Sequence, residues 1–248
     1  TPYGEHTTKL CGMEVVLADG TLVRTGMGAL TGSPTWQLYR FGFGPAWDQM
    51  FVQSNLGIVT KAGLWLMPEP ESLMGMDLEF DRPEDLGPLI DAIAPLRREG
   101  VLQQSPTIGN WLRAAAILTT RAEWTDQKGA LSDTVIAAIR KKFQMGWWGV
   151  SLRLYGRETI NREAYAILES EMNKLKPLSM KRTSWKRGDP LEMTGWTGTP
   201  LTFPMQNANW HGGLGGHIGF SPVLPQSGSA AMEQFRRTYQ RYQEFGMD

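Results

Sequence analysis

The most informative part of this sequence is the segment Met13-Glu14-Val15-Val16-Leu17-Ala18-Asp19-Gly20-Thr21-Leu22-Val23-Arg24-Thr25. Its Asp19-Gly20 pair predicts a hairpin turn, because the turn needs a positive φ. The apolar and β-branched residues on either side predict two antiparallel strands, residues 13–17 and 21–25. We therefore expect a β-hairpin here, with a sheet around it.

The chain on the C-terminal side of this hairpin divides at residue 69. Residues 26–50 are rich in Gly and Pro and lack a regular period, which predicts a long ordered loop. Next, Gly57-Ile58-Val59-Thr60 leads into residues 62–67, which we predict to be a buried strand ended by Pro68 and Pro70. We place a domain boundary there, between a first region of residues 1–69 and a second of residues 70–248.

The second region alternates predicted strands with amphipathic helices. Strands are predicted at residues 74–80, 149–155 and 217–223. Asp81 to Glu84 has the form of a capping box for the first helix, and Ser132 can cap the second. Four apolar helix faces are predicted: Leu86, Leu89, Ile90, Ile93 and Leu96; Val135, Ile136, Ile139 and Phe143; Ile160, Ala164, Ile167, Leu168, Met172 and Leu175; and Met232, Phe235, Tyr239, Tyr242 and Phe245. This order predicts an α+β fold with a sheet packed against helices.

Composition excludes several classes of function. The 248 residues carry 25 Lys and Arg against 25 Asp and Glu, so no net charge attracts nucleic acid. No uninterrupted apolar run is long enough for a membrane span, and we predict no membrane partner. The single cysteine, Cys11, excludes an internal disulfide framework, and only His6, His211 and His217 are available for zinc. We predict no metal site.

The ends and the aromatic content are also informative. Thr1-Pro2 has no initiator Met, and Gly246 resembles a helix stop close to the last residue. These features predict an interior piece of a longer protein. The 10 Trp and 13 Met suit a pocket for a planar ligand, although an ordinary core explains them more simply.

Other local motifs favour ordinary structural roles. Residues 212–216, Gly-Gly-Leu-Gly-Gly, could form an anion-binding loop, but a hairpin turn is the favoured interpretation. The basic pairs Lys181-Arg182 and Lys186-Arg187 are interpreted as solvated surface. No catalytic triad motif or Walker loop is present.

Two stretches carry a resemblance to a known family. They are residues 1–20, which contain Thr1-Pro2-Tyr3-Gly4-Glu5-His6 and Cys11-Gly12-Met13-Glu14-Val15-Val16-Leu17-Ala18-Asp19-Gly20, and residues 55–63, Asn-Leu-Gly-Ile-Val-Thr-Lys-Ala-Gly. Both resemble the FAD domain of the vanillyl-alcohol oxidase / 4-cresol dehydrogenase flavoproteins. The likeness continues, more sparsely, to Gly216-His217-Ile218-Gly219-Phe220-Ser221-Pro222-Val223. The sequence departs from the family at Thr7, Thr8 and Lys9, where bulkier apolar residues are usual.

The resemblance implies a fold, a cofactor and binding residues. Residues 1–69 would be the C-terminal part of a PP-loop-type FAD-binding domain. Residues 70–248 would be an incomplete α+β substrate (cap) domain, an antiparallel sheet flanked by helices. The cofactor would be FAD, bound by Tyr3, Gly4, Gly57, Ile58 and Val59. The residue types agree, since glycine permits close backbone approach and a strand edge offers main-chain groups to an adenine or ribose.

The resemblance also implies an activity. Members of the family oxidise para-substituted phenols by transferring a hydride from the benzylic carbon to the flavin, and the protein positions the ring and stabilises the phenolate. The implied partners are a small phenolic substrate, a homodimer, and a cytochrome c subunit as the alternative to dioxygen as electron acceptor. The family's catalytic residues are expected outside this chain, so we assign none within it.

Two other functions remain open on the sequence alone. The first is a flavin oxidase or dehydrogenase of the wider superfamily acting on a hydroxy acid or sugar. The second is a non-enzymatic sugar-binding module, which would place several Trp on one exposed strand surface. The ten Trp are scattered from Trp36 to Trp210, which argues against the second alternative.

Overall fold

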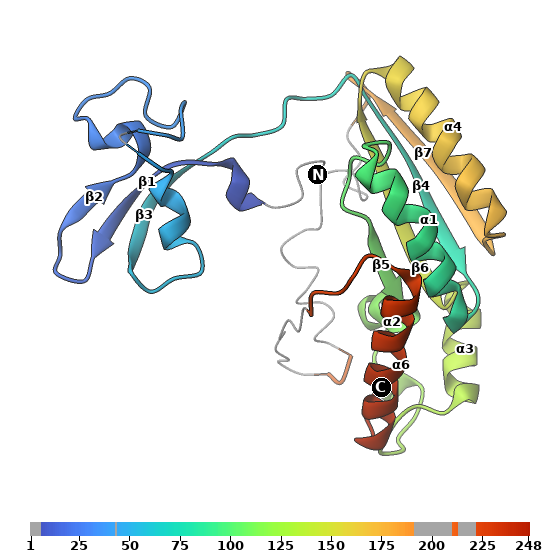
Figure 1. Cartoon of the computed structure of the whole chain (residues 1–248). Helices are drawn as coiled ribbons and strands as arrows, with labels where there is room; N and C mark the ends of the chain where they lie inside the picture. The colour runs from blue at the N-terminus through green and yellow to red at the C-terminus, as the bar shows by residue number, and fades with distance from the viewer. Residues whose placement is uncertain (1–5, 43, 191–209, 213–221) are drawn as a thin grey trace. The chain divides into compact units, whose positions relative to one another are not determined.

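A computed structural model describes residues 6–42, 44–190, 210–212 and 222–248 of the chain (Figure 1). By its internal contacts the chain forms two compact units, one of Tyr3–Glu69 and one that contains Pro70–Asp248. Each unit has its own sheet and its own buried cluster. Among the described residues, none of the helices combines the length and the apolar character that crossing a membrane requires.

The smaller unit is built on a three-stranded antiparallel sheet with the strand order β2-β1-β3. Its strands are β1 (Leu10–Leu17), β2 (Leu22–Arg24) and β3 (Gly57–Leu64). The predicted hairpin is confirmed: Val16 pairs with Leu22, the Leu17 N–H donates to the Thr21 carbonyl, and Gly20 has a φ of +86°. Turn chemistry at Asp19-Gly20 thus fixes the register of β1 and β2.

Between β2 and β3 the chain forms loops and two short 3₁₀ helices, as the lack of a period in residues 26–50 predicted. A first 3₁₀ helix, η1 (His6–Lys9), precedes the sheet, and η2 (Gly26–Ala29) and η3 (Trp47–Phe51) follow β2. Buried Asp48 on η3 accepts a hydrogen bond from the Gly12 N–H at 3.0 Å and another from the Thr25 hydroxyl. These bonds tie the loop to β1.

The larger unit has a four-stranded antiparallel sheet with the order β5-β6-β4-β7. Its strands are β4 (Ser72–Phe80), β5 (Thr107–Asn110), β6 (Trp148–Gly156) and β7 (Ser179–Lys186). The predictions of strands at residues 74–80 and 149–155 are confirmed by β4 and β6, which pair along their whole length. Strands β5 and β7 were not predicted.

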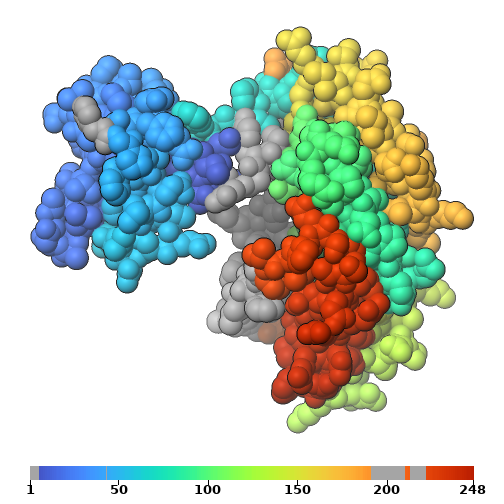
Figure 2. All heavy atoms as spheres, viewed as in Figure 1, coloured from blue at the N-terminus to red at the C-terminus, as the bar shows by residue number. Residues whose placement is uncertain are grey.

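Helices cover one face of this sheet and form the main core with it. They are α1 (Leu86–Arg98), reached through the 3₁₀ helix η4 (Pro83–Asp85), α4 (Glu158–Lys174) and α6 (Gly228–Glu244). The core contains Met76, Leu78 and Phe80 from β4, Leu152 and Leu154 from β6, and Leu89 and Leu168 from the helices. Helices α1 and α6 pack closely (Figure 2). The contact requires glycine at position 228, because a Cβ there would lie 2.2 Å from the Gly87 carbonyl oxygen.

Two further helices enclose a second apolar cluster. They are α2 (Trp111–Leu118), which was not predicted, and α3 (Asp133–Phe143), and the 3₁₀ helix η5 (Arg121–Glu123) lies between them. The predicted cap of α3 is confirmed, because the Ser132 hydroxyl accepts from the Val135 N–H. The cluster contains Trp111, Ala115, Ile136, Ile139, Met145 and Trp210.

Two local predictions in or near the strands need correction. The buried strand predicted at residues 62–67 is instead the end of β3, which begins at Gly57 and stops at Leu64. Leu64, Trp65 and Leu66 are exposed, because β3 is an edge strand and no described layer covers these residues. The N-cap residue is Arg82 and not Asp81, and only half of the predicted reciprocal pattern is present: the Asp85 carboxylate accepts from the Arg82 N–H at the start of η4.

The buried face of α4 is rotated from the predicted one. Ile160 and Ile167 are exposed, and Asn161 and Tyr165 face the sheet instead, since the Asn161 amide donates to Ser72. The predicted strand at 217–223 and the glycine loop at 212–216 lie mostly outside the described residues.

Candidate functional site

Strand β3 carries the three predicted FAD-binding residues that the structure describes. Gly57, Ile58 and Val59 are its first three residues, and they pair with Leu17, Val16 and Val15 of β1. The other two predicted residues, Tyr3 and Gly4, lie outside the described residues. Strand β3 therefore forms the described part of the candidate site.

The outer edge of β3 offers main-chain groups to a ligand. Within the described residues, β3 pairs only with β1 and so forms one edge of its sheet. Successive residues of an antiparallel strand direct their N–H and C=O groups alternately toward and away from the partner strand. At least one of residues 57–59 therefore directs both a donor and an acceptor outward, as recognition of an adenine or ribose by the backbone requires.

The side chains of this edge are unusually exposed for apolar residues. Ile58 is 72% exposed and Val59 is 41% exposed, and Leu64, Trp65 and Leu66, at and after the other end of β3, are exposed as well. Exposed apolar side chains on a sheet edge are unfavourable in water unless something covers them. This surface suits contact with a flat apolar group as well as with a further strand.

Gly57 is required by the sheet itself. A Cβ at this position would lie 2.6 Å from Val15 Cγ1 and 2.9 Å from the Val16 carbonyl oxygen. The absent side chain therefore makes room for β1 and not for a ligand, and φ at Gly57 is not positive. The expectation that glycine at 57 serves ligand approach thus has a competing explanation inside the protein.

A charged cluster on β1 holds β2 and β3 in place beside it. The Glu14 carboxylate accepts from Arg24 Nη2 at 2.7 Å and from the Thr60 hydroxyl at 3.0 Å, and Lys61 Nζ lies 3.4 Å away. These contacts span the irregular register between Glu14 and Val15. The hydrogen bonds from Arg24 and then Thr60 lower the pKa of Glu14. The cluster fixes the position of β3 directly after the candidate site.

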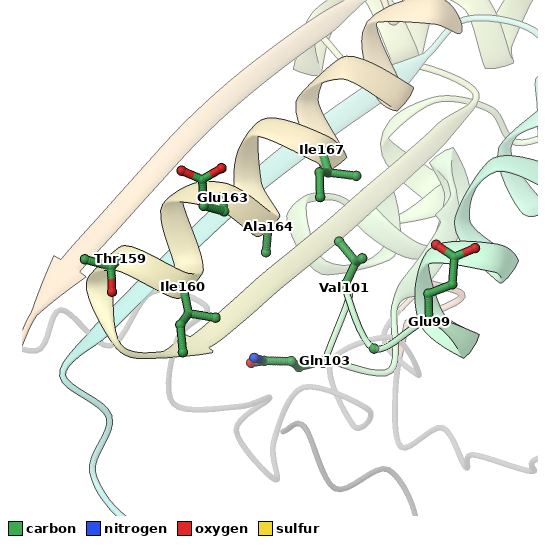
Figure 3. A pocket seen from close by; sticks show the side chains of 9 residues that line it. Glu99, Val101, Gln103, Thr159, Ile160, Glu163, Ala164 and Ile167 are labelled. Atoms are coloured by element: carbon green, nitrogen blue, oxygen red, sulfur yellow. The ribbon is translucent and has the colours of Figure 1, made fainter.

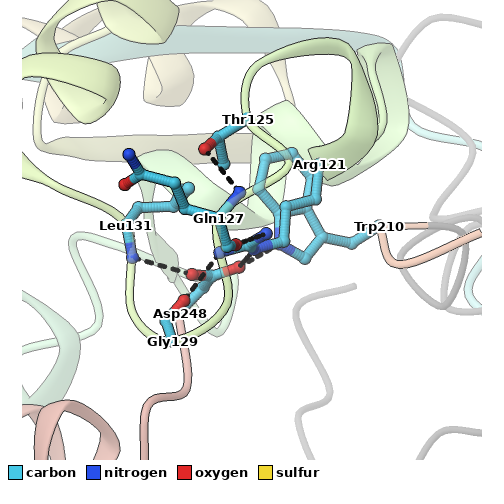
Figure 4. Close-up of polar contacts among 7 residues, drawn as sticks. All are labelled: Arg121, Thr125, Gln127, Gly129, Leu131, Trp210 and Asp248. Carbon is cyan, nitrogen blue, oxygen red and sulfur yellow. Dashed lines mark hydrogen bonds and ion pairs between the residues drawn. The ribbon is translucent and has the colours of Figure 1, made fainter.

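The larger unit contains a partly buried polar cluster that the sequence did not reveal (Figure 4). Arg121 Nε lies 2.9 Å from the Asp248 carboxylate, and the same guanidinium donates to the carbonyls of Gln127 and Gly129. Asp248 also accepts from the Trp210 indole N–H at 2.8 Å and from the Leu131 N–H. The cluster joins three segments that are distant in the sequence, residues 121–131, Trp210 and Asp248, and its residues have no common spacing that a sequence pattern could have detected.

A second such cluster lies on the sheet face opposite α1 and α4. Arg153 on β6 donates to Asp77 on β4 at 2.7 Å, and Ser151 donates to the same carboxylate at 2.6 Å. Gly75 makes room for the Arg153 side chain, since a Cβ at Gly75 would lie 2.6 Å from Arg153 Cδ. In the part of the chain that the structure describes, no group of three or more His, Cys, Asp or Glu residues could hold a metal ion.

Comparison with known proteins extends these observations. No family model matches the chain. The chain is 34% identical over its whole length to the 4-cresol dehydrogenase [hydroxylating] flavoprotein subunit of Pseudomonas putida and covers 48% of that protein. It is thus similar to about half of that relative's length.

Two solved structures match the whole chain. One is p-cresol methylhydroxylase with substrate bound, at a TM-score of 0.85 and 34% identity, with 49% of that chain covered. The other is the 4-ethylphenol oxidase of Gulosibacter chungangensis in its isoeugenol complex, at a TM-score of 0.87 and 30% identity, again with 49% covered. Sequence and fold therefore agree that the chain belongs to the vanillyl-alcohol oxidase / 4-cresol dehydrogenase family of FAD-binding flavoproteins.

Proposed function

We propose that this chain works in an FAD-dependent oxidoreductase that oxidises para-substituted (4-alkyl) phenols at the benzylic carbon by hydride transfer to the flavin. The observation that carries the proposal is the likeness over the full chain to proteins named for 4-cresol and 4-ethylphenol chemistry. Bound FAD supplies the hydride acceptor in such chemistry, so the protein's task is to bind, orient and exclude water.

In this proposal β3 holds the adenine side of the cofactor. The outward main-chain groups of residues 57–59 bind the nucleotide, and the exposed Ile58 and Val59 side chains cover its apolar surface. Tyr3 and Gly4 are proposed to contribute the turn beside it. The Glu14 cluster keeps β3 in register, because Thr60 is hydrogen-bonded to Glu14 next to the site.

The proposal includes partners. A small phenolic substrate binds in the complete enzyme, and the electrons leave either to dioxygen or to a cytochrome c subunit. The word "subunit" in the name of the Pseudomonas putida relative supports a partner protein, because it describes that relative as one part of an assembly. A homodimer is also proposed.

Anaerobic reduction of the holoenzyme tests the reaction. We expect 4-cresol and 4-ethylphenol to bleach the oxidised flavin absorbance, because the para hydroxyl can deliver electrons to the benzylic position. The matched controls are 3-cresol and 4-methylanisole, which lack the para relationship and the ionisable hydroxyl respectively, and neither should bleach the flavin. Bleaching by a hydroxy acid or a sugar, with none by the 4-alkylphenols, would overturn the proposal.

The electron acceptor is tested on the same reduced protein. Fast reoxidation by oxidised cytochrome c with slow reoxidation by dioxygen supports a cytochrome partner, and the reverse order supports an oxidase.

A further inference from the structure

A groove on the larger unit lies between the start of α4 and the turn after α1 (Figure 3). It is an open surface groove of about 500 Å³, and its apolar lining is Val101, Ile160, Ala164 and Ile167. Its polar lining includes Glu99, Gln103 and Glu163. None of these residues belongs to the candidate flavin site on β3, so the groove is independent of the proposed function.

The local sequence explains why apolar side chains reach this surface. Gly100, at a φ of +77°, ends α1, and the Leu102 N–H then bonds back to the Leu96 carbonyl at 3.0 Å. Leu102 is thereby drawn into the core, where it is fully buried, and Val101 is left at the groove. The backbone bond across this turn holds Val101 in place.

The other wall is a second apolar stripe on α4. Ile160, Ala164 and Ile167 recur at helical spacing on the side of α4 that faces Val101 and Gln103 in Figure 3. The sheet is covered by Tyr165, Leu168 and Met172 of the same helix, so the stripe is additional to the core face. Ile160 is 58% exposed and Ile167 is 45% exposed, while the small Ala164 between them gives the groove its depth.

Two carboxylates edge this groove. Glu163 projects from α4 and Glu99 from the end of α1 (Figure 3), and neither forms an ion pair with any residue that the structure describes. By contrast, the neighbouring Glu158 and Glu169 on α4 pair with Lys186 and Arg182 of β7. An apolar groove edged by two uncompensated carboxylates is complementary to an aliphatic segment that carries basic residues.

We propose that this groove binds an amphipathic, basic helical segment of a partner protein, with aliphatic side chains against Val101 and the α4 stripe and Lys or Arg beside Glu99 and Glu163. Helices bind grooves in this way through apolar residues spaced three and four apart. A second copy of this chain is disfavoured as the occupant, because a two-fold contact here would bring two copies of Glu99 and Glu163 into one interface.

Fluorescence anisotropy with two synthetic peptides tests this proposal. One is a labelled amphipathic helix of Leu and Lys, and the other has Glu in place of each Lys. The basic peptide should bind the purified protein, more weakly as salt is raised, and the acidic peptide should not. In hydrogen exchange, the basic peptide should protect residues 99–103 and 159–167. Equal binding of the two peptides, no binding of the basic one, or protection confined to other segments would overturn the proposal.

Variants locate the contact. Ile167→Asp and Glu163→Lys should each weaken the basic peptide about tenfold or more, as loss of an interface anchor does. The matched controls are Ala166→Asp, on the exposed side of α4 outside the groove, and Glu233→Lys on α6, and both should bind within about twofold of the wild type. Melting curves of all four establish that they fold. Equal weakening in Ile167→Asp and Ala166→Asp contradicts the proposal, as does a dimer, measured by sedimentation, that Ile167→Asp alone abolishes.

Discussion

The two units of this chain bury their apolar residues to very different extents. The unit of Pro70–Asp248 packs α1, α4 and α6 onto one face of its sheet around a core that includes Met76, Leu89 and Leu152. The buried cluster of the smaller unit is limited, among the described residues, to Leu10, Met13 and Val15. Its exposed surface includes large apolar side chains such as Leu38, Ile58 and Leu66. The sheet of the larger unit thus has a helical layer of its own, whereas no described α-helix covers the sheet of the smaller one.

This difference separates residues that stabilise the fold from residues available for binding. In the larger unit, an exposed apolar side chain such as Ile167 lies outside the core that the sheet and helices form. In the smaller unit, apolar side chains are exposed along the edge of β3. We expect contacts with a ligand or with another part of the protein to bury them. Variants in the two units should therefore differ in kind.

The largest expected effect is in the larger unit, from Arg121→Met. The Asp248 side chain is 3% exposed, so removing its guanidinium partner leaves a buried carboxylate without its cation. Such losses cost about 3–5 kcal/mol of unfolding free energy. The control is Arg237→Met on α6, whose side chain is 77% exposed and should contribute less than about 0.5 kcal/mol. Chemical denaturation measures both, and equal small losses would show that the Asp248 cluster is not a stabilising element.

A smaller effect is expected in the other unit, from Gly57→Val. The new side chain must displace Val15 and the Val16 carbonyl, so we expect a loss of about 1–3 kcal/mol, confined to residues 3–69. Gly20→Val is the comparison, because a Cβ at Gly20 would meet no atom within 4 Å. The only cost there is backbone strain at a φ of +86°, which should lower the unfolding free energy by about 1–2 kcal/mol. Hydrogen exchange resolved by segment measures both losses. Faster exchange in β4 or β6 would contradict the independence of the two units.

Acid should act in opposite directions on Glu14 in the smaller unit and on Glu79 in the larger unit. Hydrogen bonds from Arg24 and Thr60 lower the pKa of Glu14 below 4.5, so its contribution is present above that pH and is lost as the pH falls through the lowered pKa. Burial raises the pKa of Glu79 on β4 above 4.5, with Asp77 adding to the shift, so the ionised form is disfavoured in the fold. Stability from Glu79 therefore rises as the pH falls through that raised pKa toward 4.5.

The variants Glu14→Gln and Glu79→Gln check these directions. For Glu14→Gln, the melting temperature should lie below that of the wild type at neutral pH, and the two should converge as the pH is lowered. For Glu79→Gln, the gain on acidification seen in the wild type should disappear. The same pH dependence in both variants would contradict the assigned directions.

The sequence predicted those elements whose pattern depends on burial or turn chemistry. The hairpin at Asp19-Gly20 follows from turn geometry, and β4 and β6 were predicted because their apolar residues face a covered core. Strand β7 was missed because most of its side chains, including Lys181 and Arg182, are exposed polar groups on a sheet edge. Those two residues are indeed at the surface, as predicted, although they belong to a strand.

The face of α4 shows why the remaining details needed tertiary structure. Ile160 and Ile167 have the periodicity of a core face, but Asn161 and Tyr165 face the sheet instead. Asn161 is held there because its side-chain amide donates a hydrogen bond to the Ser72 carbonyl at the start of β4. The candidate site was predicted from resemblance and main-chain chemistry alone. The role of Gly57 against β1 depends on a contact that only the paired strands reveal.

The smallest effect on stability is expected for the variant that tests the central claim, which is that the β3 edge binds FAD. Ile58→Asp places a carboxylate on the edge proposed to hold an anionic nucleotide. Leu22→Asp places the same charge on β2, the opposite edge of the same sheet, where Leu22 is 54% exposed. Flavin affinity of the apoprotein, titrated by fluorescence quenching, should fall about tenfold or more for Ile58→Asp because like charges repel. It should be unchanged for Leu22→Asp, with equal melting temperatures for both apoproteins. Equal flavin affinity in the two variants would contradict the assignment of β3 as the cofactor-binding edge.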